Sequence, residues 1–269
     1  MGTTLPLDPA LDAALSPGRM GTFLAAAGGD HVLARELYVW NRDLSMAILA
    51  DIAMLEVSMR NAIGTALERR WGPRWYEKGP VFDQRSMGQL ATAWGRIPKG
   101  KKANRNDPAL PGRLVANCMF GFWSNLLDEG GPAGKGPRDE KADYDALWLV
   151  IRREFKGARA EAKASKAKYR REWVHGVVKI VNDLRNRAAH HEPLINGFPL
   201  NGQQRRLTAQ QGYENCLKLA RMLDSNLAAW IESTSSVPRL LATRPAAGQT
   251  HAPRCAVAAH DAAPGYPDF

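Results

Sequence analysis

The chain contains 269 residues, of which 45% are hydrophobic and 24% charged, so it can bury a sizeable core. No apolar run approaches the ~18 residues that a membrane-spanning helix needs, and the first twenty residues lack the basic start and apolar centre of a secretory signal. The three cysteines, Cys118, Cys216 and Cys255, are too scattered for a disulfide framework or a paired-cysteine zinc site. We therefore expect a cytoplasmic protein without a membrane span.

The charge balance is strongly positive. The 37 lysines and arginines exceed the 27 aspartates and glutamates, which gives a formal net charge of +10. An excess of this size favours a polyanionic partner, and nucleic acid is the commonest one. General basicity in a protein rich in arginine and alanine is the alternative, and charge alone does not separate the two.

Both ends of the chain differ in composition from the middle. Residues 1–20 contain three prolines and few large apolar groups, which predicts a flexible N-terminal arm. Residues 233–269 are rich in Pro, Ala, Gly and Ser without sustained periodicity, which predicts a disordered tail. The sequence thus predicts one folded domain, at residues 21–232.

The first strong periodic signal runs from His31 to Arg70. Apolar residues recur there at steps of three or four, which predicts one long amphipathic helix or two helices separated by a short turn. The Gly72-Pro73 pair then disfavours continuation of the helix. The apolar positions are Leu33, Leu37, Trp40, Leu44, Ile48, Ile52, Leu55, Met59, Ile63 and Leu67.

A second apolar segment runs from Leu114 to Leu127. It carries apolar side chains on nearly all sides, which predicts a buried helix. Two loops rich in Gly and Pro flank it, at residues 98–113 and 128–141, and the first loop is strongly basic.

The C-terminal half is also helical in pattern. Residues 144–173 begin apolar and continue as a basic run, and a stripe from Trp173 to Ala188 predicts a helix that Pro193 ends. A last helix is expected from about Thr208 to Glu232, with Tyr213, Leu217, Ala220, Leu223, Leu227 and Trp230 on one face. Few segments alternate with the period of a strand, so the sequence predicts an all-α fold. The basic run consists of Lys156, Arg159, Lys163, Lys166, Lys168, Arg170 and Arg171.

The segment DLRNRAAHHEPLI, Asp183 to Ile195, carries the strongest chemical signal, and it allows three interpretations. His190 and His191 can form a helix C-terminus, where the macrodipole favours a cation. They can bind a metal, although no HExxH motif or cysteine pair accompanies them. Alternatively, Arg185 can grip a phosphodiester while His190 exchanges a proton.

The spacing within this segment does not by itself bring the two groups together. On an ideal helix Arg185 and His190 are offset by ~140° around the axis. They can converge where the helix unwinds before Pro193, because the residue before a proline is pushed away from the α region.

The string LRNRAAHH resembles the Arg-Asn-x-x-x-His signature of the HEPN superfamily, the higher eukaryote and prokaryote nucleotide-binding domains. Many of these small helical bundles are metal-independent ribonucleases. Residues 38–77 resemble the N-terminal block of the Abi-like (abortive infection) branch, with an Asn after an aromatic pair, a Glu-x-x-x-Arg-Asn element, and a turn with Trp-Gly and Trp-Tyr. Residues 120–127 resemble its middle block, and the matching blocks occur in order over residues 40–200.

This resemblance implies a HEPN-like helical bundle with extra helices and basic loops. It also implies a catalytic set at the end of the predicted helix. Arg185 would contact the scissile phosphate, and His190 would move the proton of the ribose 2′-hydroxyl or of the leaving oxygen. Asn186 would orient the pair, and His191 would either substitute for His190 or pack.

A second group of supporting residues comes from the N-terminal block. The resemblance implies that Glu56, Arg60 and Asn61 form another polar wall of the same cleft. The alternative for Glu56 and Arg60, which are four residues apart on one helix face, is a surface ion pair that contributes little to stability.

Basic residues outside the motif are expected to contact RNA phosphates beside the cleft. A solvated helix face and a flexible loop are the alternatives for these residues. Only Phe155, Tyr169 and Trp173 interleave with the basic run, so base stacking there is weakly supported. The expected RNA-binding residues are Lys99, Lys101, Lys102, Arg105, Lys163, Lys166 and Arg170.

The function implied by the resemblance is a metal-independent endoribonuclease that acts in phage defence or as a toxin. It would cleave RNA by transesterification, without a cofactor or metal, as a homodimer, and an antitoxin or another defence-system component is a further partner. The first alternative is a non-catalytic HEPN module that binds RNA or a protein partner. A second is an antitoxin or regulatory subunit that binds a nucleotide.

Overall fold

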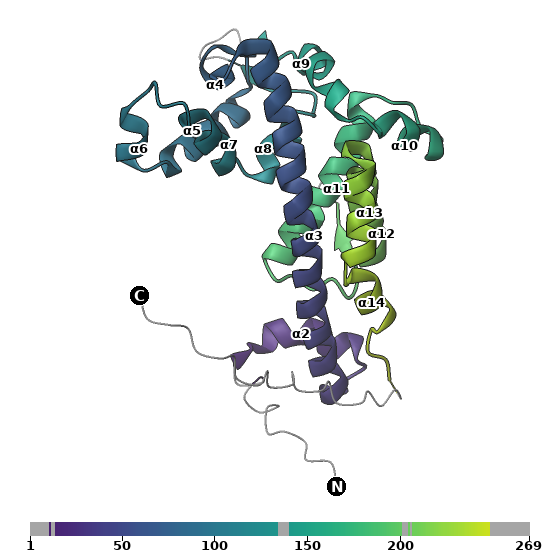
Figure 1. Cartoon of the computed structure of the whole chain (residues 1–269). Helices are drawn as coiled ribbons and strands as arrows, with labels where there is room; N and C mark the ends of the chain where they lie inside the picture. The colour runs from purple at the N-terminus through teal and green to yellow at the C-terminus, as the bar shows by residue number, and fades with distance from the viewer. Residues whose placement is uncertain (1–10, 12–13, 134–139, 201–203, 205, 248–269) are drawn as a thin grey trace, which may run out of the picture. The chain divides into compact units, whose positions relative to one another are not determined.

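The computed structural model describes residues 11, 14–133, 140–200, 204 and 206–247 (Figure 1). The described chain is mostly α-helical, which confirms the predicted all-α class, and its only strands form two short antiparallel pairs in which Pro132 faces Lys141 and Phe198 faces Leu207. The elements are α2 (Pro17–Ala26), α3 (His31–Trp71), α4 (Trp75–Lys78), α5 (Gln84–Arg96), α6 (Lys99–Ala103), α7 (Leu110–Asn117), α8 (Phe120–Asn125), β1 (Pro132–Ala133), β2 (Glu140–Lys141), α9 (Tyr144–Ile151), η1 (Arg152–Glu154), α10 (Ala158–Ala164), α11 (Arg171–Ala189), β3 (Phe198–Pro199), β4 (Arg206–Leu207), α12 (Ala209–Leu223), α13 (Ser225–Thr234) and α14 (Val237–Ala242).

The longest helix is α3, which runs without interruption from His31 to Trp71. Every apolar position predicted for its stripe is buried, so the pattern is confirmed and the two-helix alternative is wrong. Asp30 caps the first turn by accepting a hydrogen bond from the Val32 N–H at 2.8 Å. The helix ends where Gly72 adopts a φ of 84°, a conformation that glycine reaches readily.

The chain divides into two compact units, residues 1–40 with 243–269 and residues 41–242. This division differs from the single domain predicted for residues 21–232, since the boundary falls inside α3. In the first unit Phe23 packs edge-on against Tyr38 with 5.3 Å between ring centroids. The Arg244 guanidinium lies 5.6 Å from the ring centroid of Trp40 in the same unit.

Both predicted ends of the domain need correction. α2 begins at Pro17, inside the predicted arm, because Ser16 accepts a hydrogen bond from the Arg19 N–H and proline suits the first helical turn. α13 continues to Thr234 and α14 covers Val237–Ala242, both inside the predicted tail. The side chains of Val237 and Leu240 are buried, so a single apolar turn too short to show periodicity still packs. Residues 1–10, 12–13 and 248–269 of the predicted arm and tail lie outside the described residues.

Two segments predicted as single helices are each broken in two. α7 and α8 are separated at Cys118 and Met119, whose ψ angles of 126° and 162° are extended, although the apolar segment is largely buried as predicted. The last helix breaks at Asp224, whose carboxylate accepts a hydrogen bond from the Asn226 N–H at 2.7 Å and so caps α13. Trp230, predicted on the buried face, is 51% exposed.

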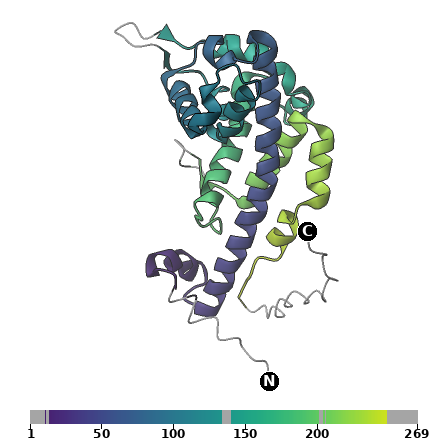
Figure 2. The same cartoon turned by 60° about the vertical axis from the view of Figure 1, so that its left-hand side comes forward.

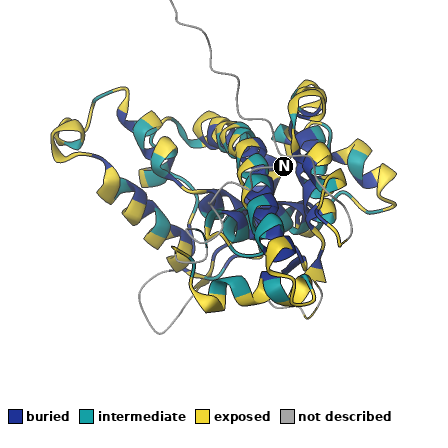
Figure 3. Cartoon of the chain, turned by 90° about the horizontal axis from the view of Figure 1, so that it is seen from below, coloured by how far each residue is buried: buried dark blue, intermediate teal, exposed yellow. Residues whose placement is uncertain are grey.

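Within the second unit, α3 has α4–α8 along one side and α12–α13 along the other (Figures 1 and 2). Seen from below, the buried residues of the helices face inwards and the exposed residues face outwards (Figure 3). α11 packs along α12, and Gly212 permits their close approach. A Cβ at Gly212 would lie 2.9 Å from both Leu184 Cδ2 and Phe198 Cε1. Because Leu184 immediately precedes Arg185, this packing positions the helical turn that carries the predicted catalytic motif.

No helix in the described residues has the combination of length and apolar character that crossing a membrane requires.

Some helix contacts in the second unit bury polar groups. Asp51 of α3 is 5% exposed, and it accepts a hydrogen bond from the Ser235 hydroxyl at 2.5 Å. Burial raises the pKa of Asp51, and the hydrogen bond from Ser235 offsets only part of this rise.

The raised pKa of Asp51 predicts a pH dependence of stability. The folded state binds this proton more tightly than the unfolded state does. Its contribution to stability is therefore fully present below the ordinary aspartate pKa of about 4 and is lost as pH rises through the raised value. We expect Asp51→Asn to remove this contribution, so the melting temperature of the wild type should fall relative to the variant as the pH rises above about 4.

A second variant sharpens this measurement. Ser235→Ala removes the hydrogen bond that favours the ionised carboxylate, so the pKa of Asp51 should rise further and the loss of stability should extend to higher pH. Thermal unfolding of the wild type, Asp51→Asn and Ser235→Ala across the pH range supplies the comparison. Parallel curves for the wild type and Asp51→Asn would contradict the raised pKa.

Candidate active site

The predicted catalytic residues lie at the C-terminal end of α11. Arg185 and Asn186 are half-buried, and Arg185 Nη1 donates a hydrogen bond to Asn186 Oδ1 at 3.4 Å. Among the described residues Arg185 makes no ion pair with a carboxylate, whereas Arg187 pairs with Glu192 two residues beyond His190. The Arg185 guanidinium therefore retains most of its donors for an anionic ligand.

The end of α11 has the geometry of a Schellman motif. His190 is the C-cap residue, and His191 follows it with a left-handed φ of 55°. The His191 N–H donates to the Ala188 carbonyl at 3.1 Å, and the Glu192 N–H donates to the Arg187 carbonyl at 2.9 Å. Glycine usually occupies the left-handed position, although histidine is among the residues that tolerate it.

This geometry separates the roles of the two histidines. Both are exposed, so the prediction that His191 packs is wrong. Its left-handed backbone satisfies the helix end instead, which agrees with the helix-terminus interpretation for this residue. The His190 backbone still makes a helical hydrogen bond, because its N–H donates to the Asn186 carbonyl at 3.0 Å.

The helix does not unwind early enough to bring Arg185 and His190 together. α11 stays regular through Ala189, the C-cap residue His190 has a φ of -90° and a ψ of 10°, and the left-handed turn follows at His191. The offset of about 140° between Arg185 and His190 therefore persists, with Asn186 between them at about 100° from Arg185. Within the described chain no hydrogen bond joins the His190 side chain to either residue.

Replacing His191 by glycine is expected to stabilise the protein by up to about 1 kcal/mol, because glycine adopts a left-handed φ without the strain of a side chain. His191→Val should destabilise by about 1–2 kcal/mol, since a β-branched residue fits this conformation poorly. Urea unfolding measures both changes. Equal stability of the two variants would contradict the structural role, and RNA cleavage retained by His191→Gly would separate that role from catalysis.

Asn41 anchors the chain just after the motif. Its side-chain oxygen accepts a hydrogen bond from the Leu194 N–H at 2.7 Å, and the residue is 4% exposed. The contact ties the segment that leaves α11 to α3. Asn41 was not among the predicted site residues, although a polar residue inside the buried stripe of α3 is a signal for such a buried hydrogen bond.

The second predicted wall consists of Glu56 and Arg60, which are half-buried, and Asn61, which is exposed. In the described part of the chain no ion pair joins Glu56 to Arg60, so the surface ion-pair alternative is wrong, and Arg60 Nε is buried without a hydrogen-bond partner. Arg60 lies near the junction of α7 and α8. Burial raises the pKa of the Cys118 thiol to about 12, and the nearby Arg60 charge opposes this rise. A shared cleft with Arg185 stays a prediction.

The predicted RNA-binding residues form two separate groups. Lys99, Lys101 and Lys102 belong to α6, and Arg105 follows it. The second group is Lys163 of α10 with Lys166 and Arg170 in the segment after it. Figure 1 shows α6 and α10 on opposite sides of α3, so the two groups do not form one patch.

One cation of the predicted basic run has a different role. Arg171 is 6% exposed, donates to the Leu127 carbonyl at 3.1 Å, and pairs with Asp145 at 2.7 Å. It therefore joins α11 to the start of α9 and the end of the apolar segment. Exposed lysines and arginines are better placed than the buried Arg171 to contact phosphates. Lys99, Lys101 and Lys163 are exposed.

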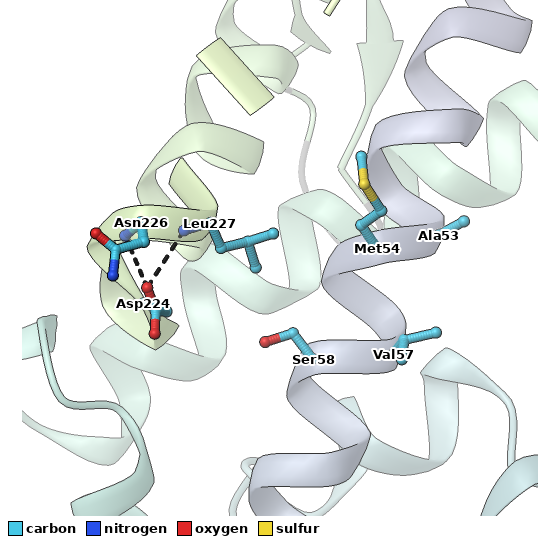
Figure 4. Close-up of a pocket in the computed structure, with 7 residues that line it drawn as sticks. All are labelled: Ala53, Met54, Val57, Ser58, Asp224, Asn226 and Leu227. Atoms are coloured by element: carbon cyan, nitrogen blue, oxygen red, sulfur yellow. Dashed lines mark hydrogen bonds between the residues drawn. The ribbon is translucent and has the colours of Figure 1, made fainter. Parts of the chain in front are cut away.

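A groove of about 640 Å³ lies between α3 and the start of α13 (Figure 4). In Figure 4 the side chain of Leu227 points toward α3, and Ser58 points toward Asp224. Asp224 Oδ1 already accepts hydrogen bonds from the N–H groups of Asn226 and Leu227. No predicted catalytic or RNA-binding residue lines this groove, so it is not the candidate active site. Its lining residues are Ala53, Met54, Val57, Ser58, Asp224, Asn226 and Leu227.

Among the described residues no group of three or more His, Cys, Asp or Glu side chains is arranged to hold a metal ion. The fold and the site define a mostly α-helical protein with an Arg-Asn-His set at a helix C-terminus. No protein-family model matches the chain, and no curated protein or solved structure is significantly similar to it. The functional interpretation therefore depends on the residues themselves.

Proposed function

We propose that the chain is a metal-independent endoribonuclease of the Abi-like HEPN class, acting in phage defence or as a toxin. The observation that carries the proposal is the end of α11. There Arg185 has no carboxylate partner in the described chain and donates to Asn186, and His190 is exposed at the C-cap. The formal charge of +10 supports an anionic substrate.

The proposed reaction uses the ribose 2′-hydroxyl as the nucleophile. His190 accepts its proton, and the 2′-oxygen attacks the adjacent phosphorus. The bond from phosphorus to the 5′-oxygen breaks, that oxygen takes a proton from water, and protonated His190 returns its proton to the solvent. The products are a 2′,3′-cyclic phosphate and a 5′-hydroxyl. Arg185 binds the phosphate and stabilises its developing negative charge, while Asn186 holds the guanidinium.

A homodimer accounts for the angular separation of Arg185 and His190. Because these residues lie on different sides of α11, one copy alone does not present them in a single direction. We propose that two HEPN-like bundles face each other, so that a shared groove contains two Arg/His sets. An antitoxin that covers this groove is the defence-system partner that fits the proposal.

The same separation favours a second candidate function. A non-catalytic module that binds RNA or a protein needs no convergence of Arg185 and His190, and the described chain contains no hydrogen bond between their side chains. In that case Arg185 and His190 have no catalytic role. Cleavage distinguishes the two candidates.

The test is an incubation of the purified full chain with end-labelled single-stranded RNA in the presence of EDTA. We expect fragments with a 2′,3′-cyclic phosphate, and no cleavage of the same RNA with 2′-O-methyl riboses, because the nucleophile is then blocked. Intact RNA would favour the binding module. Cleavage that appears only after magnesium is added would contradict the proposed mechanism.

A further inference from the structure

A small pocket lies beside the basic helix α6, among α4, α5 and α7. Its volume is about 310 Å³, at the low end of the range of about 300–1,000 Å³ for small-ligand sites, which suits a small planar group. The walls are mainly apolar and aromatic, with a cation and a carboxylate at the edge. The lining includes Tyr76, Glu77, Trp94 and Arg105.

Two aromatic rings contribute to this pocket. The ring centroids of Tyr76 and Trp94 are 6.3 Å apart, and the planes are tilted by 40°. The Arg105 guanidinium lies 4.6 Å from the Trp94 centroid. A guanidinium is planar and delocalised, so it stacks on an aromatic face much as a nucleobase does. Arg105 thus marks a surface of Trp94 that accepts a flat group.

Arg105 is held there by contacts that a ligand can replace. Its side chain is 61% exposed, and its ion pair with Glu77 has an N···O distance of 3.5 Å. Exposed pairs of this kind contribute little to stability. A base stacked on Trp94 can therefore displace the guanidinium, which remains near enough to bind the attached phosphate.

One residue of the lining also has an unsatisfied hydrogen-bonding group. Tyr76 Oη is buried and has no hydrogen-bond partner in the described part of the chain. Burial raises the pKa of Tyr76, with the Glu77 charge acting in the same direction and Arg74 and Arg105 opposing it, so the hydroxyl stays protonated. A buried donor of this kind normally has an acceptor, and a base in the pocket supplies one only after the Tyr76 side chain shifts, because the hydroxyl has almost no accessible surface.

Further cations lie on α6, the helix that precedes Arg105. Lys99 and Lys101 of α6 are exposed, and Lys102 Nζ donates to the Trp94 carbonyl at 3.2 Å. Arg74 fixes the segment after α6, because its Nη2 donates to the Arg105 carbonyl at 2.6 Å and to Asn106 Oδ1 at 2.7 Å. These cations suit a phosphate, and phosphate contacts position a nucleotide without reading its base.

We propose that this pocket binds a phosphorylated nucleobase, with the base against Tyr76 and Trp94 and the phosphate toward α6 and Arg105. The identification of an RNA strand as the source of the base rests on the proposed function, whereas the stacking pocket rests on its own geometry. The pocket is then a substrate-binding subsite that holds an unpaired base of the RNA. Stacking is tolerant of sequence, because every base has a flat face.

The experiment measures binding separately from cleavage. A fluorescent oligoribonucleotide with 2′-O-methyl riboses is titrated with the full chain, and its anisotropy is followed, with 5′-AMP added as a competitor in a second arm. Trp94→Ala is compared with Trp230→Ala, a matched loss of an exposed tryptophan outside the pocket. Tyr76→Phe is the conservative second variant, and the melting temperature of each variant shows whether it folds.

We expect Trp94→Ala to weaken oligonucleotide binding roughly fivefold to a hundredfold, the range for loss of one stacked base. Tyr76→Phe should weaken it less, and Trp230→Ala should bind like the wild type. Competition by 5′-AMP that is lost in Trp94→Ala supports the same pocket with a free nucleotide as an additional source. Folded Trp94→Ala and Tyr76→Phe that bind both probes like the wild type would overturn the inference.

The two proposals fail in different ways. Trp94-dependent binding without RNA cleavage by the wild type would overturn the nuclease proposal and leave the stacking pocket in place. RNA cleavage by the wild type with oligonucleotide binding unaffected by Trp94→Ala would overturn the pocket and leave the nuclease. Absence of binding to either probe also overturns the pocket.

Discussion

Arg185→Ala is expected to lower the rate of RNA cleavage about 10²–10³-fold, the usual loss when a group that stabilises transition-state charge is removed. The melting temperature should change little, because the Arg185 guanidinium makes only a long hydrogen bond, to Asn186, in the described chain. The measurement is the initial rate with labelled RNA at saturating and limiting substrate. Arg185→Lys should retain part of the activity, since it keeps the charge and loses the bidentate grip.

Arg187 provides a matched control for this prediction. It lies two residues further along α11, and its guanidinium pairs with Glu192. Arg187→Ala should therefore retain cleavage, with a loss of stability within about 1 kcal/mol. Wild-type cleavage by a folded Arg185→Ala protein would remove Arg185 from the mechanism. Equal loss of cleavage in both variants would indicate a general effect of basic charge on α11.

Gly197→Ala is expected to destabilise the protein by about 2–5 kcal/mol. Gly197 has a φ of 70°, which costs an L-residue about 1–2 kcal/mol, and a Cβ there would lie 2.3 Å from the Leu207 carbonyl oxygen. That oxygen is backbone and cannot move aside, so overpacking adds about 1–3 kcal/mol. The substitution would also disturb the turn in which the Gly197 N–H donates to the Leu194 carbonyl. Leu194 is itself anchored, because its N–H donates to the Asn41 side chain.

Gly72→Ala separates the two causes. Gly72 has a φ of 84°, but a Cβ there would meet no atom within 4 Å, so only the backbone strain of about 1–2 kcal/mol applies. Urea unfolding of the two variants should therefore differ by the overpacking contribution. Equal losses of stability would show that the Leu207 carbonyl is not an obstacle to a side chain at Gly197.

The periodic part of the fold was predictable, whereas its interruptions were only partly so. The stripe from Leu33 to Leu67 identifies α3 because burial of one helix face imposes a period of 3.6 residues. Asp224 carries a local signal for a break, since Asp is a preferred N-cap residue, and the sequence analysis missed it. The break at Cys118 and Met119 has no glycine or proline. Its cause is tertiary, because Phe122 and Trp123 pack among the rings of Trp75 and Phe82.

The candidate site was also only partly predictable from the sequence. Arg185, Asn186 and His190 are close in sequence, so their motif was visible, but the direction of each side chain around α11 depends on where the helix ends. The left-handed conformation of His191 places that end after His190, and no spacing rule required it. Tyr76, Trp94 and Arg105 lie far apart in the sequence, so Arg105 was predicted only as a phosphate contact and Tyr76 only as part of the Trp-Tyr turn.

By itself the sequence determined the helical class, the buried face of α3 and the chemical groups available at the end of α11, because periodicity and composition are local properties of the chain. Only the tertiary structure decided that α6 and α10 carry their charges on opposite sides of α3, and that Trp94 lies beside Tyr76 and Arg105. These spatial arrangements depend on how the helices pack and where they break. Packing is governed by complementary shapes between segments distant in sequence, which no local pattern records.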